Sequence, residues 1–216
     1  MNTTSLHPKI TEHNTWIQYL PWTLSITSSV LAIAVWANFL HWDFGAISTY
    51  QFFPVLGLLA FSIMWTHYMV GFLHRIVLKE HDFKNYYRIT GYVVLAAICL
   101  HPGLLIFKRF QDGFGFPPHS YETYVAPGLG WITLLGSASL LVFLAYELHR
   151  FYENKSWWKY VVYAGDTAMV AIFYHGLRLG STLQTGWFRY VWWFYGVTLI
   201  GTILYKYYVT LYRKEE

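Results

Sequence analysis

Charged residues are scarce in this sequence of 216 residues. Asp, Glu, Lys and Arg together make up 12% of it, about half of the ~25% that is usual in soluble domains. So few charges cannot cover a water-exposed surface, which argues against a soluble globular domain. The single cysteine, Cys99, excludes an intrachain disulfide and leaves the redox compartment open. A Gly-rich nucleotide-binding loop and low-complexity linkers are also lacking.

Long apolar runs make up most of the chain. Apolar residues reach 56% and aromatic residues 21%, and many of the 11 Trp and 19 Tyr lie at the ends of the runs, the depth that these side chains prefer in a membrane. Each run is close to the ~20 residues with which a helix crosses ~30 Å of hydrocarbon. The runs are continuous rather than alternating, which favours helices over a barrel. We therefore predict an all-α integral membrane bundle, a single transmembrane domain over 1–216, with six spans at about 21–40, 53–73, 86–107, 126–148, 158–178 and 187–208.

The positions of Lys and Arg predict the orientation of this bundle. Basic residues are enriched in cytoplasmic loops. With both termini in the cytoplasm, 11 of the 15 basic residues lie in inner segments, and only Lys108, Arg109, Arg178 and Arg189 lie outside. The polar N-terminal segment lacks the charged region and cleavage site of a signal peptide, so the first span is expected to act as its own insertion signal. We expect a multi-pass protein of the plasma membrane, whose inner basic residues are Lys9, Arg75, Lys79, Lys84, Arg88, Arg150, Lys155, Lys159, Lys206, Arg213 and Lys214.

Two of the ten histidines lie deep inside predicted spans that run in the same direction. His101 is 15 residues beyond the start of the third span, and His175 is 17 residues beyond the start of the fifth. These positions are about 22 and 25 Å from the inner edge, so both imidazoles are expected at nearly the same height in the outer part of the bilayer. Gly91 and Gly165 each precede their histidine by ten residues, close to three helical turns, and therefore share its face.

This repeated pair of glycine and histidine predicts a bound haem. A planar macrocycle between two helices needs a basic nitrogen on each side and a small residue where its edge would meet the backbone. His101 and His175 would fill both axial positions of one haem iron, with Gly91 and Gly165 making room for the macrocycle. The alternative is a non-redox transporter or scaffold subunit, in which the histidines hydrogen-bond neighbouring helices and the glycines permit close packing.

Two stretches resemble a known family: 87–91 (Tyr-Arg-Ile-Thr-Gly), which leads to His101, and 158–162 (Trp-Lys-Tyr-Val-Val), which leads to His175. Over the second to sixth spans the chain is similar to the ferric-reductase-like transmembrane domain. This family includes NADPH oxidases, iron and copper metalloreductases and the haem subunit of the bacterial methionine-sulfoxide-repair reductase. Its third and fifth spans typically carry two histidines each, but Tyr87 and Val162 stand here where the inner pair would be.

The resemblance implies a membrane cytochrome b with one haem b near the outer face, held by His101 and His175, and without the inner haem of the family. The chain would be the electron-transfer component of an oxidoreductase. Its electron donor would be separate, either a soluble reductase, a quinol or a bound flavin, with FAD or FMN on the inner side as one option. The outer acceptor would be a metal ion, oxygen or a protein. We expect the protein to be surrounded by membrane lipid and not to bind nucleic acid. The sequence leaves the oligomeric state open.

Other polar residues of the spans have weaker interpretations. Arg178 follows His175 by three residues on the same face, so it is a candidate partner for a haem propionate, as are Lys108 and Arg109; the alternative is that these side chains reach for the headgroups. Asp166 lies about 12 Å into the fifth span. It either relays protons or contacts an inner cofactor, or it hydrogen-bonds a Tyr or Trp.

Three further histidines lie toward the inner ends of the second and fourth spans. His67 and His74 are seven residues apart and share a helix face, and with His149 they are predicted to form an inner cluster. Such a cluster would hold an unconventional second haem, or shape a flavin or quinol site.

Overall fold

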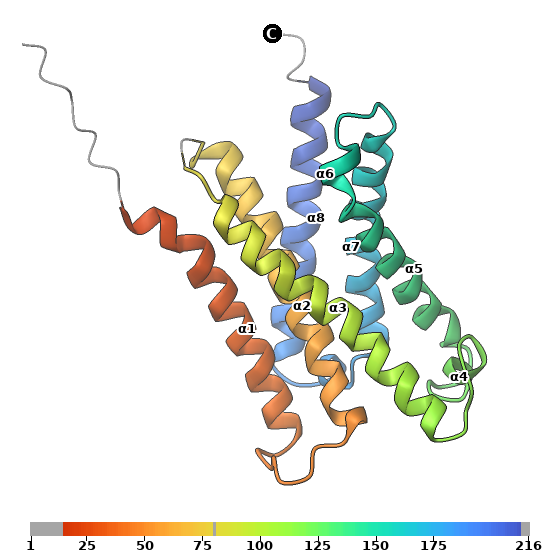
Figure 1. Cartoon of the computed structure of the whole chain (residues 1–216). Helices are drawn as coiled ribbons and strands as arrows, with labels where there is room; N and C mark the ends of the chain where they lie inside the picture. The colour runs from red at the N-terminus through yellow and green to blue at the C-terminus, as the bar shows by residue number, and fades with distance from the viewer. Residues whose placement is uncertain (1–14, 80, 213–216) are drawn as a thin grey trace, which may run out of the picture.

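The computed structural model describes residues 15–79 and 81–212 (Figure 1). Within these ranges the chain is helical, with no strand. Lys9, Arg213 and Lys214, on which part of the predicted orientation depends, lie outside the described residues. The elements in chain order are η1 (Thr15–Tyr19), α1 (Leu20–Phe39), α2 (Thr49–Ile76), α3 (Lys84–Gln111), α4 (His119–Glu122), α5 (Gly130–Tyr146), α6 (His149–Tyr152), α7 (Trp158–Leu179), η2 (Ser181–Leu183) and α8 (Phe188–Tyr212).

The predicted all-α class is confirmed for the described residues, and each of the six apolar runs lies largely in one long helix. The boundaries differ where capping residues decide them. α2 begins at Thr49 because Ser48 and Gln51 form a capping box: the Ser48 side chain accepts from the backbone N–H of Gln51, and the Gln51 side chain accepts from that of Ser48. The chain leaves α3 through Gly113, whose φ of 85° suits a residue without Cβ.

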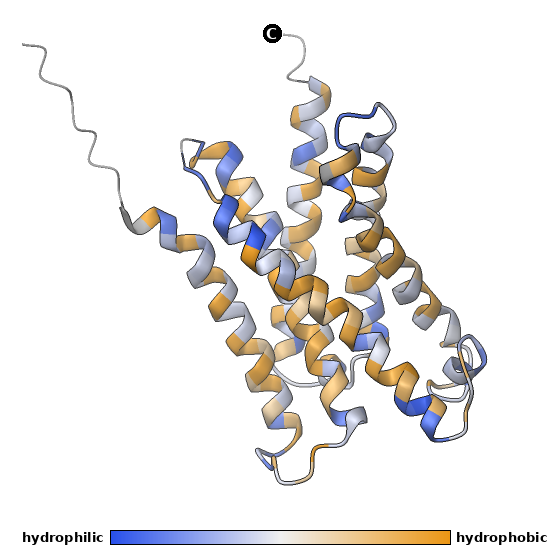
Figure 2. Ribbon diagram, in the orientation of Figure 1, coloured by the Kyte–Doolittle hydropathy of each residue, from blue (hydrophilic) through white to orange (hydrophobic). Residues whose placement is uncertain are grey.

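Three helical segments are long and apolar enough to cross a membrane: Ile17–Phe39, Thr49–Ile76 and Lys84–Gln111. α5 is apolar but shorter, with 17 residues. α7 and α8 have 22 and 25 residues, but polar side chains such as Asp166, His175 and Lys206 dilute their apolar character. Figure 2 shows apolar residues along the middle of the helices and polar ones mainly near their ends. These features indicate a membrane protein.

The outward-facing side chains agree with a lipid environment. Ile26 of α1 is 61% exposed, and Val197 and Leu204 of α8 are 67% and 63% exposed. So many exposed aliphatic side chains on several helices would be unfavourable in water, because contact between apolar surface and water raises the free energy of the folded protein. In the hydrocarbon core of a bilayer the same surface carries no such penalty.

The helices pack as two connected groups. α2 lies against α1, α3 and α8, while α5 pairs with α7. An aromatic core joins α2 and α8: the ring centroids of Trp65 and Tyr195 are 4.2 Å apart, and those of Phe61 and Trp192 are 4.3 Å apart. Phe173 of α7 packs into the same core, against Trp192. This core fixes α7 relative to α2, and therefore fixes the two histidine-bearing helices within one bundle.

Candidate functional site

His101 of α3 and His175 of α7 are held in the same way. Nδ1 of His101 is 2.8 Å from the carbonyl oxygen of Phe53, and Nδ1 of His175 is 2.8 Å from that of Ile132. A carbonyl oxygen only accepts hydrogen bonds, so in both imidazoles the Nδ1 atom must carry the proton and donate it. Nε2 of each neutral ring then keeps its lone pair.

The two Nε2 atoms are the atoms available to a ligand. Neither makes a hydrogen bond to any of the described residues. A histidine that binds a metal commonly donates its other ring N–H to a backbone carbonyl, which fixes the tautomer and raises the basicity of the ligating nitrogen. Both histidines show this arrangement.

A glycine completes each binding position. Gly57 follows Phe53 by one helical turn on α2, and Gly136 follows Ile132 by one turn on α5. A Cβ atom built on Gly57 would lie 2.9 Å from Cε1 of His101, and one on Gly136 would lie 2.7 Å from Cε1 of His175. We use the term imidazole seat for this combination of a carbonyl and a glycine one turn later. The chain builds it twice, on two pairs of neighbouring helices.

Gly57→Ala and Gly136→Ala are expected to displace the imidazole from its seat. The imidazole ring cannot simply rotate away, because its Nδ1 is hydrogen-bonded to a carbonyl that lies one turn before the glycine, on the helix of the glycine. Loss of such an orienting contact typically costs about 10–100-fold in metal affinity, so each variant should retain less metal cofactor. The measurement is the cofactor content of the purified protein.

Gly201→Ala is the matched control, because a Cβ at Gly201 of α8 would meet nothing within 4 Å. Alanine is favoured over glycine in a helix by about 1 kcal/mol, so this variant should keep its cofactor and be at least as stable as the parent. Equal cofactor retention by Gly57→Ala, Gly136→Ala and Gly201→Ala would contradict the role of the seats.

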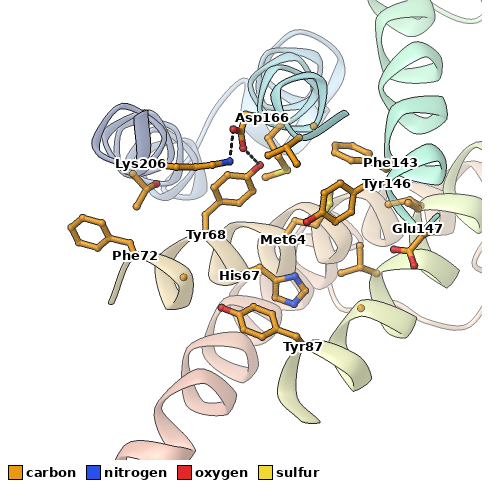
Figure 3. Close-up of a pocket in the computed structure, with 18 of the residues that line it drawn as sticks. Met64, His67, Tyr68, Phe72, Tyr87, Phe143, Tyr146, Glu147, Asp166 and Lys206 are labelled. Carbon is orange, nitrogen blue, oxygen red and sulfur yellow. Dashed lines mark hydrogen bonds and ion pairs between the residues drawn. The ribbon is translucent and has the colours of Figure 1, made fainter. Parts of the chain in front are cut away.

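Gly91 and Gly165 do not touch the histidines but border a cavity. This cavity of about 350 Å³ lies between α2, α3, α5, α7 and α8 (Figure 3). A Cβ on Gly91 would meet nothing within 4 Å, and one on Gly165 would lie 4.0 Å from the ring of Tyr146. Packing within the described protein therefore does not require either glycine. Val162 lines the same cavity.

The three predicted propionate partners differ in their surroundings. Arg178 is exposed and has no hydrogen bond or ion pair among the described residues. Lys108 pairs with Asp112, with Nζ and Oδ1 2.5 Å apart. Arg109 is buried; its guanidinium donates to Thr123 and lies over the ring of Phe114. Lys108 and Arg109 thus have partners within the protein, whereas Arg178 has none among the described residues.

Asp112 follows α3 and ties its end to α2. Its carboxylate accepts hydrogen bonds from Lys108 and from the hydroxyl of Tyr50, with Tyr50 Oη 2.6 Å from Oδ2. The bond from Lys108, followed by that from Tyr50, lowers the pKa of Asp112 below its usual value. The carboxylate therefore stays charged at neutral pH and keeps both partners.

Asp166 lies in a buried network that joins α2, α7 and α8. Tyr68 donates to its Oδ1 at 2.8 Å, while Tyr207 and Lys206 donate to its Oδ2 at 2.5 and 2.6 Å. The predicted hydrogen bond to a tyrosine is confirmed. Lys206, assigned from the sequence only to the cytoplasmic end of the chain, is an unforeseen partner, and Figure 3 shows it directed at Asp166.

The inner histidines have separate partners. Nε2 of His67 lies 2.7 Å from the Thr90 hydroxyl, the ring of His74 packs edge-on against Phe83, and Nδ1 of His149 lies 3.2 Å from the carbonyl of Tyr146. In the part of the chain that the structure describes, no three or more His, Cys, Asp or Glu side chains form a group suited to a metal ion. The structure therefore does not gather these three histidines into one such group, and a cofactor at any of them stays a prediction.

The donor set fits a metal that brings most of its own ligands. His101 and His175 offer two neutral imidazole nitrogens, and a metal ion bound by protein alone usually has three or four protein ligands. A porphyrin supplies four nitrogens to its iron and leaves two axial positions, which histidines commonly fill. Two oriented imidazoles, with no third ligand grouped with them among the described residues, match that number of axial positions.

Comparisons of the chain with protein-family models, with curated proteins and with solved structures find no match. The resemblance to the ferric-reductase-like domain therefore depends on the sequence stretches around His101 and His175, and the assignment of function depends on the geometry of the site.

Proposed function

We propose that this chain is a membrane cytochrome b of the ferric-reductase-like type, which carries electrons across the bilayer through one haem b. Nε2 of His101 and Nε2 of His175 would hold its iron. The observation that carries this proposal is the pair of matched imidazole seats, in which both Nδ1 atoms donate to carbonyls at 2.8 Å and both Nε2 atoms stay unengaged by the described residues.

The proposed membrane arrangement has six spans, formed by α1, α2, α3, α5, α7 and α8, with both termini in the cytoplasm. The distribution of Lys and Arg supports this orientation. In Figure 1 the start of α1 and the end of α8 lie at the same end of the bundle, as an even number of crossings requires. On this arrangement His101 and His175 lie toward the outer face of the plasma membrane.

The haem would supply one-electron chemistry between ferric and ferrous iron, and the protein would supply position and environment. The Phe53 and Ile132 carbonyls orient the imidazoles and increase their basicity. With both histidines holding the iron, the protein would leave no position on the iron for an outer acceptor. Arg178 is proposed to pair with a propionate. The donor is a separate molecule, and the acceptor is a metal ion, oxygen or a protein.

A haem count on the purified protein tests the proposal. Protein from haem-replete cells should be red, its Soret band should sharpen on reduction with dithionite, and a pyridine haemochrome assay should give about one haem per chain. Two haems would return His67, His74 and His149 to consideration as ligands. A colourless protein would favour the non-redox transporter or scaffold, whose histidines only stabilise the bundle.

A further inference from the structure

The cavity beside Gly91 and Gly165 is separate from the pair of imidazoles. Neither His101 nor His175 lines it. The two glycines precede the histidines by ten residues, which is about 15 Å along a helix axis. The cavity nevertheless begins one turn below the histidines, because Ile98 of α3 is one of its lining residues. A molecule in the cavity would thus lie directly on the inner side of the proposed haem.

The wall of the cavity is largely apolar and aromatic. It includes Met64, Phe72, Leu95 and Phe143, from three different helices. Gly91 and Gly165 leave parts of opposite walls without side chains, and a Cβ at either position would meet nothing closer than 4.0 Å. A flat apolar ring is the kind of ligand that such a space between helices accommodates.

His67 presents a hydrogen-bond acceptor to this space. The Thr90 hydroxyl donates its one proton to the carbonyl of Tyr86 at 2.7 Å, so at the Thr90 oxygen Nε2 of His67 must be the donor. The proton of the neutral imidazole is therefore on Nε2, and Nδ1 keeps a lone pair with no partner among the described residues.

Two tyrosines add hydroxyl groups that can donate. Tyr87 and Tyr146 both line the cavity, and neither hydroxyl has a hydrogen-bond partner among the described residues. Figure 3 shows the Tyr146 hydroxyl pointing toward the side on which His67 lies. The cavity thus offers one acceptor and two possible donors on an otherwise apolar wall, which suits a ring that carries hydroxyl or carbonyl groups.

The charges around the cavity favour a neutral ligand. Lys206 is neutralised by Asp166, and the other charged lining residues are Arg75 and Glu147, one of each sign. A ligand with a phosphate group would bring an excess of negative charge next to Glu147, with Arg75 as the lone counter-charge not already paired in the described wall. Glu147 is partly buried, so added negative charge beside it would be unfavourable. A neutral ring needs no counter-charge.

We propose that this cavity binds a membrane-soluble quinone or hydroquinone, with a ring hydroxyl or carbonyl held by Nδ1 of His67 and the hydroxyls of Tyr87 and Tyr146. Used as the electron donor, a hydroquinone would be oxidised to the quinone: its two electrons would pass one at a time to the proposed haem, and its two protons would pass to water at the inner face. That use rests on the proposed function, whereas the binding does not.

Titration of the full chain in detergent with a decyl-substituted benzoquinone, and separately with its hydroquinone, tests this site. The readout is the affinity from calorimetry. Gly91→Leu places a side chain in the cavity, from a position where a Cβ meets nothing within 4 Å, and should weaken binding at least about tenfold, the equivalent of 1.4 kcal/mol. His67→Leu removes the acceptor and should weaken binding of the hydroquinone about fivefold, as expected for one hydrogen bond. Gly201→Leu, where a Cβ also meets nothing within 4 Å, is the matched control and should bind like the parent.

Haem content measured on the same samples separates this proposal from the proposed function. Gly91→Leu should lose the quinone and keep its haem, and replacement of His101 should lose haem and keep the quinone. Absence of quinone binding in a haem-loaded parent would overturn the proposal and leave the cytochrome intact. Quinone affinities that are equal in Gly91→Leu and Gly201→Leu would also overturn it, as would binding of FMN in the cavity in place of the quinone.

Discussion

His101→Gly and His175→Gly should each yield a protein without bound haem. Either change removes one axial nitrogen and leaves its partner on the opposite helix to hold the iron alone. Loss of a group that only orients a metal-binding histidine already costs about 10–100-fold in metal affinity, so loss of the histidine itself should cost at least about 100-fold. The measurement is the Soret absorbance per protein after purification, with helix content and elution volume recorded to show that the bundle is intact.

Added imidazole distinguishes a lost ligand from a damaged fold. Glycine leaves a space of the shape of the missing ring, beside Gly57 or Gly136, so imidazole in the buffer together with haem should restore the Soret band in both variants. His119→Gly is the matched control, since His119 is exposed on α4 with 77% of its side chain accessible, and it should keep its haem. Full haem content in His101→Gly or His175→Gly without imidazole would contradict the assignment.

Lys206→Met should strongly destabilise the bundle. Lys206 is the cationic partner of Asp166, which is 5% exposed, and its removal leaves a buried carboxylate with only the hydroxyls of Tyr68 and Tyr207. Breaking a buried ion pair by removing one partner typically costs about 3–5 kcal/mol. The free energy of unfolding in mixed micelles, obtained by titration with SDS, measures this loss.

A double variant tests whether the loss comes from the unpaired charge. Asp166→Asn in the Lys206→Met background removes the carboxylate charge and keeps an oxygen that accepts from Tyr68, so it should recover most of the lost stability. Lys159→Met, at an exposed lysine of α7, is the matched control and should unfold like the parent. A Lys206→Met protein as stable as this control would show that the ion pair contributes little.

Sequence alone predicted the helices because continuous apolar runs leave few alternatives. It placed the start of α2 too late, since the capping box of Ser48 and Gln51 lies in a polar segment before the run. Prediction of a membrane span from apolar residues is weakest for α7 and α8, because the polar residues Asp166, His175 and Lys206 interrupt their apolar runs. The number of spans and the orientation stay predictions.

The imidazole seats could not be predicted from the sequence. His101 and His175 were recognisable because histidine is rare and costly in a membrane span. Their partners are backbone carbonyls, which every residue has, and glycines on other helices, which have no fixed spacing from the histidines. Gly57 and Gly136 become meaningful only when the packing of α2 on α3 and of α5 on α7 is known. Gly91 and Gly165 had the more regular spacing, but they line the neighbouring cavity.

Electron paramagnetic resonance of the oxidised protein tests most directly whether one iron is shared by the imidazoles of α3 and α7. Two imidazole nitrogens on opposite faces of a ferric porphyrin produce a six-coordinate, low-spin iron. A single low-spin signal with no high-spin component, in protein that carries about one haem per chain, is the result expected here. A high-spin signal, which marks an iron lacking one strong axial ligand, would contradict ligation by both His101 and His175.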